Sequence, residues 1–191
     1  MGYGEYFNLC ADLGAEPIPC LNVGLTCQGR NGFDINVDAR EKLSMTDDQF
    51  RQYLIDVRGY AQDDTDGIES RIEEVNALGY TSEADFDAYL ETIALTPGTA
   101  EWENYVQDIL DLIEYANGDA TTTYWGAIRA ANGHEQPYDL KYIGLGNENW
   151  GDVYWRNFDA LYKEVKAVYP DITVITTSGT WLGGADFDRA W

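Results

Sequence analysis

The stretch of sequence best suited to chemistry is a short apolar segment that ends in a carboxylate between two amides. Residues 141–145 are apolar enough to predict a buried strand, and Gly146, Asn147, Glu148, Asn149 and Trp150 follow directly. Parallel α/β proteins carry their catalytic groups at the C-terminal ends of strands. A carboxylate, two amides and an indole at such a place are the groups that handle sugars. Glu148 is therefore the first candidate for a catalytic residue.

The residue types around Glu148 allow two interpretations. If Glu148 lies among apolar neighbours, its neutral form is favoured and it can act as a general acid. Asn147 could then donate to a sugar hydroxyl, while Trp150 or Trp181 offers an apolar face to a sugar ring. The alternative is a structural glutamate satisfied by the neighbouring amides, with Trp150 in the core. Composition alone does not separate the two interpretations.

The charge balance narrows the classes of partner. The sequence has 191 residues, with 34 acidic and 12 basic side chains and a formal net charge of −22. Such a charge repels nucleic acids and anionic membrane surfaces, so we expect neither as a partner. Neutral ligands such as carbohydrates are compatible with this charge, and solubility alone is a sufficient reason for the acidity.

Nothing in the sequence indicates a metal or another cofactor. Cys10, Cys20 and Cys27 lack the paired spacing of a disulfide framework or zinc site, and His134 is the one histidine. No basic and apolar leader opens the chain, and a helix is predicted almost from its first residue. We therefore expect the natural start to lie further upstream, which leaves the compartment open between cytoplasmic and secreted.

Three apolar segments with polar C-terminal ends predict three parallel strands. They cover residues 15–24, 141–146 and 172–179, and amphipathic helices precede them at residues 3–13, 99–117 and 155–168, with a short helix at 121–131. This order fits a doubly wound sheet or a (β/α)₈ barrel. No Gly-x-Gly-x-x-Gly follows a strand, so a dinucleotide-binding sheet loses its main support and a barrel is favoured.

Residues 29–100 differ from the rest of the chain. They are rich in glycine, aspartate and asparagine, with weak helical spacing at residues 46–60, 68–78 and 82–95. We expect a helical insertion within a single domain that spans residues 1–191. Because eight βα units need about 250 residues, the predicted fold is an incomplete TIM barrel of roughly three units.

A series of short motifs, in order along the chain, carries a family resemblance. The motifs include Leu13-Gly14-Ala15-Glu16-Pro17, Leu21-Asn22-Val23-Gly24, Ile113-Glu114-Tyr115-Ala116-Asn117-Gly118, Trp125-Gly126-Ala127-Ile128-Arg129-Ala130 and Leu145-Gly146-Asn147-Glu148. Gly146-Asn147-Glu148 resembles the acid/base motif of the clan of retaining glycosidases built on (β/α)₈ barrels. The whole series, over residues 5–28 and 105–182, is similar to glycoside hydrolase family 51, the α-L-arabinofuranosidases.

The resemblance implies a role for each matching residue. The three strands would be the third, fourth and fifth of the barrel, with Glu148 as general acid/base. Asn147 would bind the sugar's 2-hydroxyl, and Asn22 would belong to the pocket wall. The substrates would be arabinose-containing oligo- or polysaccharides of plants, and no cofactor would be needed.

The nucleophile of the family is a glutamate on the seventh strand, and this sequence contains no match to that strand. We expect Asp152 to cap a helix and Asp186 and Asp188 to be solvated, so none of them replaces the nucleophile. The resemblance therefore implies a fragment that is inactive on its own.

Other functions stay open at this point. The chain could belong to another retaining glycosidase of the same clan, or be a catalytically silent carbohydrate-binding remnant, or be a purely structural fragment. Unpaired strand edges and bare apolar faces in a partial barrel predict association with a second copy or a complementary barrel fragment, or poor solubility.

Overall fold

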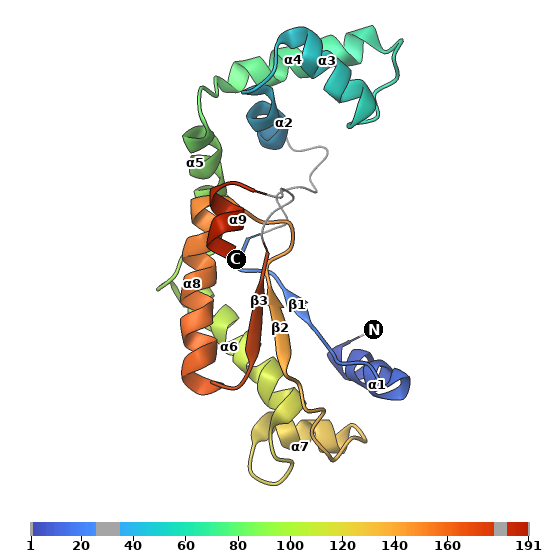
Figure 1. The fold of residues 1–191 in the computed structure, drawn as a ribbon, viewed down its shortest axis with the longest axis vertical. Helices are drawn as coiled ribbons and strands as arrows, with labels where there is room; N and C mark the ends of the chain where they lie inside the picture. The colour runs from blue at the N-terminus through green and yellow to red at the C-terminus, as the bar shows by residue number, and fades with distance from the viewer. Residues whose placement is uncertain (1, 26–34, 178–182, 191) are drawn as a thin grey trace. The chain divides into compact units, whose positions relative to one another are not determined.

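The computed structural model of the protein describes residues 2–25, 35–177 and 183–190. The chain folds as two compact units (Figure 1). The first unit consists of Met1–Thr26 with Leu95–Trp191, and the second consists of Cys27–Ala94. Within the described ranges, no helix combines the length and the apolar character needed to cross a membrane.

The first unit is built on a small parallel sheet. Its strands are β1 (Cys20–Leu21), β2 (Tyr142–Leu145) and β3 (Thr173–Thr176), and they lie in the order β1-β2-β3. Leu21 pairs with Leu145, and Leu145 pairs with Thr176, so the three strands end at one edge of the sheet. The prediction of parallel strands in an α/β fold is confirmed.

Strand β1 is much shorter than the predicted strand over residues 15–24. Proline has no backbone N–H to donate, and Pro17 and Pro19 stand just before the paired residues. The pairing depends instead on carbonyl groups, because Gly144 N donates to Pro19 O at 2.9 Å and Gly146 N donates to Leu21 O at 2.7 Å. The prediction of a long first strand is therefore wrong.

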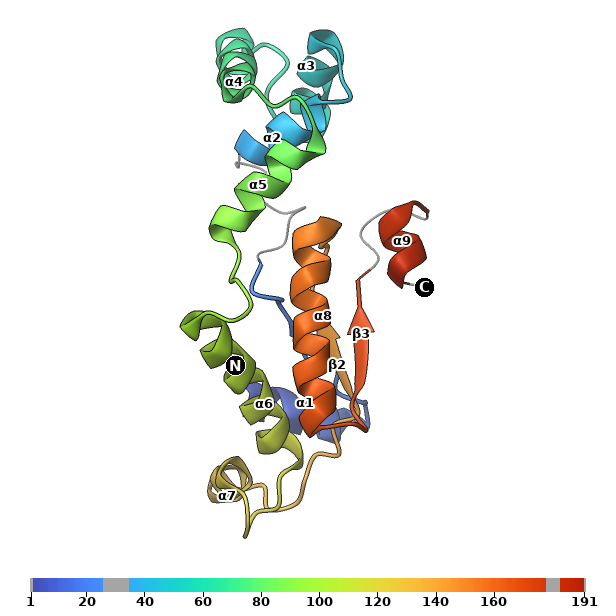
Figure 2. The ribbon, with the colours of Figure 1, turned by 90° about the vertical axis from the view of Figure 1, so that its left-hand side faces the viewer.

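In the described part of the first unit, five helices accompany this sheet: α1 (Tyr3–Leu13), α6 (Ala100–Asn117), α7 (Tyr124–Ala131), α8 (Gly151–Val168) and α9 (Ala185–Ala190). Helices α6 and α8 cover the same face of the sheet (Figures 1 and 2). Ile113 of α6 and Leu161 of α8 are fully buried. On the opposite face Cys20 is exposed and Ile175 keeps 40% of its surface, so this face is open among the described residues.

A buried arginine and an asparagine bind backbone groups of the connection between α6 and β2. Arg129 is fully buried, and its guanidinium donates to Tyr115 O at 2.9 Å and to Glu135 O at 3.0 Å. Asn117 holds both backbone groups of Leu140, with hydrogen bonds of 2.8 and 2.7 Å. Buried carbonyls outside regular structure need such partners. These contacts fix where β2 begins.

The second unit is helical. It consists of α2 (Ile35–Lys42), α3 (Asp47–Asp56), α4 (Thr65–Leu78) and α5 (Glu83–Ile93). The buried side chains of its core are Ala39, Phe50, Leu54, Ile68, Ile72 and Val75. The sequence predicts the last three helices but not α2, because a core-facing position of α2 is an aspartate.

That aspartate, Asp38, is the charged centre of the second unit. Its side chain is completely buried, and it accepts hydrogen bonds from Arg58 Nε and Arg71 Nε, each at 2.7 Å. A buried carboxylate is tolerated only when it is paired and hydrogen-bonded. The two arginines satisfy this requirement from outside α2 and tie their own segments to it.

We expect Asp38→Asn to destabilise the second unit by about 3 kcal/mol, because Arg58 and Arg71 would both lose the buried negative charge that they contact. Urea-dependent hydrogen exchange of the amides in α2–α4 measures this unit separately. The control is Glu69→Gln, which removes an ion pair with Arg51 on the exposed surface and should have little effect. An Asp38→Asn variant that resists urea as well as the control does would contradict the prediction.

Candidate functional site

The three strands of the sheet bring two of the predicted site segments to one edge. Asn22 follows β1, and Asn147 and Glu148 follow β2. All three side chains are exposed. The carboxyl ends of neighbouring parallel strands meet at one edge of a sheet. The structure therefore places an amide and an amide–carboxylate pair on adjacent strand ends.

Glu148 lies in the turn between β2 and α8. It is one of two non-glycine residues with positive φ among the described residues, at φ +51°, the other being Asp139 at +57°. Its side chain is exposed, so Glu148 does not lie among apolar neighbours in this structure. The reason is the shape of the turn, in which Asn149 and Trp150 take the buried positions.

The turn itself is tightly constrained. Gly146 has φ +98° and Gly151 has φ +83°, values that favour glycine, and Glu148 lies between them. Asn149 is 1% exposed, and its Oδ1 accepts a hydrogen bond from Asn147 N at 2.8 Å. A buried amide thus braces the turn from inside while Asn147 and Glu148 face outward.

Tyr154 joins the ends of β2 and β3 beneath this turn. Its completely buried hydroxyl donates to Leu145 O at 3.0 Å and accepts from Thr177 N at 3.1 Å. It also shares a 2.7 Å hydrogen bond with Thr176 Oγ1. Burial raises the pKa of the Tyr154 phenol, which keeps its proton in place for these contacts. The predicted helix over residues 155–168 starts one residue too late to include Tyr154.

Of the two tryptophans predicted to bind sugar, the structure describes Trp150. Trp150 is 8% exposed and stands at the start of α8, so its indole offers little surface to a ligand in this structure. This placement favours the alternative of a core residue. Trp181 lies outside the described residues. Both binding roles stay predictions.

The carboxylates that follow Glu148 are placed differently from one another. Asp152 lies in the first turn of α8, where a negative charge is favourable, but the N-cap position is Trp150, so the prediction that Asp152 caps the helix is wrong. Asp188 is exposed, as expected. The prediction that Asp186 is solvated is wrong. Its Oδ1 accepts from Gly151 N at 2.9 Å and from Trp155 Nε1 at 2.7 Å. The sequence gives no sign of this long-range contact.

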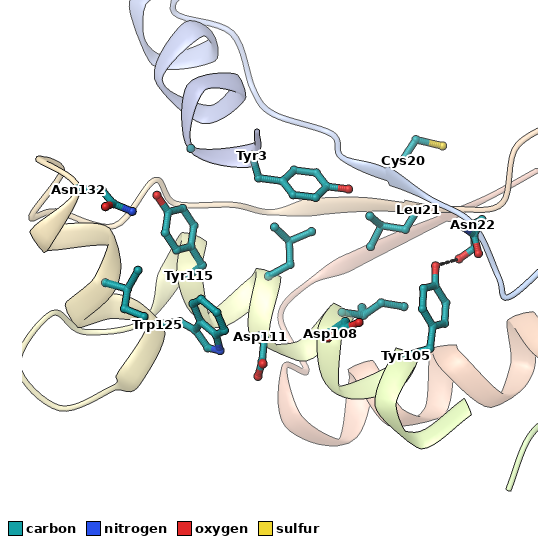
Figure 3. Close-up of a pocket in the computed structure, with 14 residues that line it drawn as sticks. Tyr3, Cys20, Leu21, Asn22, Tyr105, Asp108, Asp111, Tyr115, Trp125 and Asn132 are labelled. Atoms are coloured by element: carbon teal, nitrogen blue, oxygen red, sulfur yellow. Dashed lines mark hydrogen bonds between the residues drawn. The ribbon is translucent and has the colours of Figure 1, made fainter. Parts of the chain in front are cut away.

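A pocket of about 630 Å³ lies between α1, α6, α7 and the end of β1 (Figure 3). Its lining combines aromatic, aliphatic and acidic side chains, and includes Tyr3, Tyr105, Asp108, Asp111, Tyr115 and Trp125. Asn22 belongs to this lining, but Glu148 does not. Asn22 is also engaged locally, because its Oδ1 accepts from Gly24 N at 2.8 Å. The structure thus places Asn22 in a pocket distinct from the turn of Glu148.

Tyr105 helps to form the wall of that pocket nearest to β1. Its hydroxyl donates to the backbone oxygen of Asn22 (Figure 3). Burial, together with the charges of Tyr3 and Asp108, raises the pKa of Tyr105 to about 12. The phenol therefore remains a hydrogen-bond donor at neutral pH and fixes the end of β1.

We expect Tyr154→Phe to loosen the ends of β2 and β3 by about 1–3 kcal/mol, since it leaves a buried carbonyl and a buried N–H without their partner. Hydrogen exchange of the amides of residues 143–145 and 174–177 in increasing urea gives this free energy. Tyr162→Phe, on the exposed side of the same helix, is the matched control. Equal exchange rates in the two variants would show that the phenol hydroxyl is dispensable.

The match to a family model lies mainly in the C-terminal half of the chain. Residues 88–182 match the family model described as the alpha-L-arabinofuranosidase 1 domain. The extracellular exo-alpha-L-arabinofuranosidase of Streptomyces chartreusis is 44% identical over 90 residues, which cover 47% of this chain and 11% of that protein.

Two further relatives carry the same description. Alpha-L-arabinofuranosidase 1 of Arabidopsis thaliana is 46% identical over 79 residues, covering 41% of this chain and 12% of the relative. Alpha-L-arabinofuranosidase A of Aspergillus niger is 38% identical over 104 residues, covering 52% and 15%. The matched part of the chain thus spans between about a tenth and a seventh of the length of these relatives.

One solved structure is also similar. It is an arabinose-bound α-L-arabinofuranosidase of glycoside hydrolase family 51, with 26% identity and a TM-score of 0.40, and the match covers 47% of this chain and 14% of that one.

Proposed function

Because this chain belongs to the α-L-arabinofuranosidase family, as the sequence resemblance predicts, we propose that it carries the acid/base part of a retaining arabinofuranosidase site. One observation carries the proposal. Within the matched segment, Gly146-Asn147-Glu148 follows β2 at the carboxyl edge of a parallel sheet, with the Glu148 side chain exposed at φ +51°. Residues held in sparsely populated backbone conformations gather at functional sites.

The proposed chemistry assigns two steps to Glu148. As an acid it would protonate the oxygen of the leaving group, and as a base it would then take a proton from the water that releases the sugar. Asn147, beside it on the same exposed turn, would hold the sugar's 2-hydroxyl. The substrates would be terminal arabinofuranosyl groups of plant oligo- or polysaccharides, and the mechanism requires no cofactor.

A retaining mechanism also needs a nucleophile about 5–5.5 Å from the acid/base. Asp186 is engaged by Gly151 and Trp155, and Asp152 belongs to a helix. We therefore assign the nucleophile to a further strand, the seventh of the barrel by the family resemblance. The chain by itself would be inactive.

The proposed architecture is part of a (β/α)₈ barrel, with β1, β2 and β3 as its third to fifth strands. Three parallel strands in sequential order, with α6 and α8 on one face, support it. The open face with Cys20 and Ile175 would face the barrel interior, which side chains of other strands fill. That face would be covered by a complementary part of the barrel or by a second copy. The compact unit Cys27–Ala94 supports the proposal of an insertion, which the sequence predicts over residues 29–100.

A chimera tests the role of Glu148 directly. Residues 88–182 would replace the corresponding segment of the Streptomyces chartreusis enzyme, which is 44% identical over its match. We expect Glu148→Gln to lower kcat about 10²–10⁴-fold on a phenyl arabinofuranoside, because that leaving group needs a proton. The step that breaks the bond to dinitrophenol should change little, since this leaving group departs without one.

The control for this experiment is Glu164→Gln, an exposed carboxylate on α8, which should leave turnover unchanged. If Glu148→Gln slowed the bond-breaking step equally for the phenyl and the dinitrophenyl substrates, Glu148 would have a role other than acid/base. A folded chimera that cleaves aryl xylosides or glucosides but not arabinofuranosides would favour another glycosidase of the clan. Binding of arabino-oligosaccharide without turnover, unaffected by Glu148→Ala, would favour a silent carbohydrate-binding remnant.

The chain of 191 residues, assayed by itself, should not hydrolyse an aryl α-L-arabinofuranoside. The reason is the second carboxylate, which a retaining mechanism requires and which we place outside these three strands. Turnover that Glu148→Gln abolishes would contradict this prediction and point to a nucleophile within the chain.

A further inference from the structure

We propose that Asp186 is a positioning residue for Glu148. It holds the first residue of α8 and thereby fixes the turn 146–150. The relevance to catalysis rests on the proposed role of Glu148, whereas the anchoring itself does not.

The turn that presents Glu148 needs external support. Gly146, Glu148 and Gly151 all have positive φ, and this conformation is unfavourable for Glu148, the one of the three with a side chain. Such a conformation persists only where the surroundings impose it. On the strand side the support is Gly146, whose N–H donates to Leu21 O at 2.7 Å. On the helix side it has to come from the start of α8.

Helix α8 obtains this support from a distant residue. The first N–H groups of a helix have no partner within the helix, and the residue before α8 is Trp150, whose indole carries no acceptor. Asp186 Oδ1 accepts the N–H of Gly151 at 2.9 Å. A carboxylate is also favoured at the positive end of the helix dipole. Asp186 thus serves as the capping side chain of α8, although it lies far from this helix in the sequence.

The segment that carries Asp186 is attached to α8 at three successive turns. Asp186 contacts Gly151 and also Trp155 Nε1 at 2.7 Å. Arg189 donates to Asp159 Oδ2 at 2.7 Å, and its guanidinium lies 4.8 Å from the centre of the Trp155 ring. Residues 151, 155 and 159 form one stripe of the helix, because four residues make about one turn. Helix α9 is therefore held beside the first half of α8 (Figure 1).

This attachment has a consequence for the carboxylate three residues before Gly151. Without Asp186, Gly151 would be free to leave its conformation, and the turn would relax on its helix side. A displacement of about 1 Å in a catalytic group is enough to reduce a rate strongly. Asp186 would therefore act on the reaction through the position of Glu148, without contact to the substrate.

The test uses the full chain and nuclear magnetic resonance, with Asp186→Ala, Asp186→Asn and, as a matched control in the same helix, Asp188→Asn. We expect Asp186→Ala to shift the amide resonances of residues 147–149 and to speed exchange of the Gly151 amide about tenfold. Asp186→Asn should restore both signals, since its amide oxygen accepts the same two hydrogen bonds. Asp188→Asn should resemble the unchanged chain.

Three results would overturn the proposal. Asp186→Ala could change the signals of Gly151 and Trp155 while the amide resonances of residues 147–149 stay in place. Alternatively, Asp186→Asn could fail to restore the resonances of residues 147–149 and the exchange rate of the Gly151 amide. Unfolding of the sheet by Asp186→Ala would assign Asp186 to general stability, because a positioning residue leaves the strands intact. The test measures no turnover, so its outcome is independent of whether Glu148 proves to be the acid/base.

Discussion

The hydroxyl of Tyr154 joins the two strand ends on which the candidate site depends. It binds Leu145 O and Thr177 N at once, so β2 and β3 cannot separate at their carboxyl ends without breaking buried hydrogen bonds. The ring of Tyr154 also restricts which residue can stand at position 146. A Cβ at residue 146 would lie 2.7 Å from Tyr154 Cε2, so the residue before Asn147 has to be glycine. The glycine of the Gly-Asn-Glu motif thus has a packing reason.

The other irregular connections of the first unit use the same device, a polar side chain that satisfies backbone groups. Arg129 binds carbonyls before and after α7, Asn117 holds Leu140, and Asp186 holds Gly151. Each replaces a hydrogen bond that a longer strand or a local cap would have supplied. Short strands can therefore present well-defined ends, because their geometry depends on side chains from neighbouring helices more than on the length of the ladder.

Sequence periodicity predicts the elements whose stability is local. Helix α1 lies where apolar spacing and Gly14 place it, and α6 begins after Thr99, whose hydroxyl accepts from Trp102 N. Periodicity fails where a long-range contact decides. The sequence pattern does not indicate α2, because Asp38 occupies a core-facing position of this helix. Its charge is neutralised there by arginines 20 and 33 residues away. The motif identifies Glu148 in the sequence, but the exposure of its side chain follows from the shape of the turn. That turn ends at Gly151, which binds Asp186, and no local sequence pattern indicates this contact.

The chain leaves the first unit and returns to it close to the ends of the strands that carry the candidate site. Leu95 N donates to Gly24 O at 2.7 Å, and Asn157 Nδ2 donates to both Val23 O and Leu95 O at 2.9 Å. The chain thus leaves and re-enters the first unit at one place, held by a buried side chain of α8. Closing a loop there costs little more for a long excursion than for a short one. The excursion also has its own hydrophobic core, which includes Phe50 and Leu54, and this supports the proposal of an insertion within a barrel.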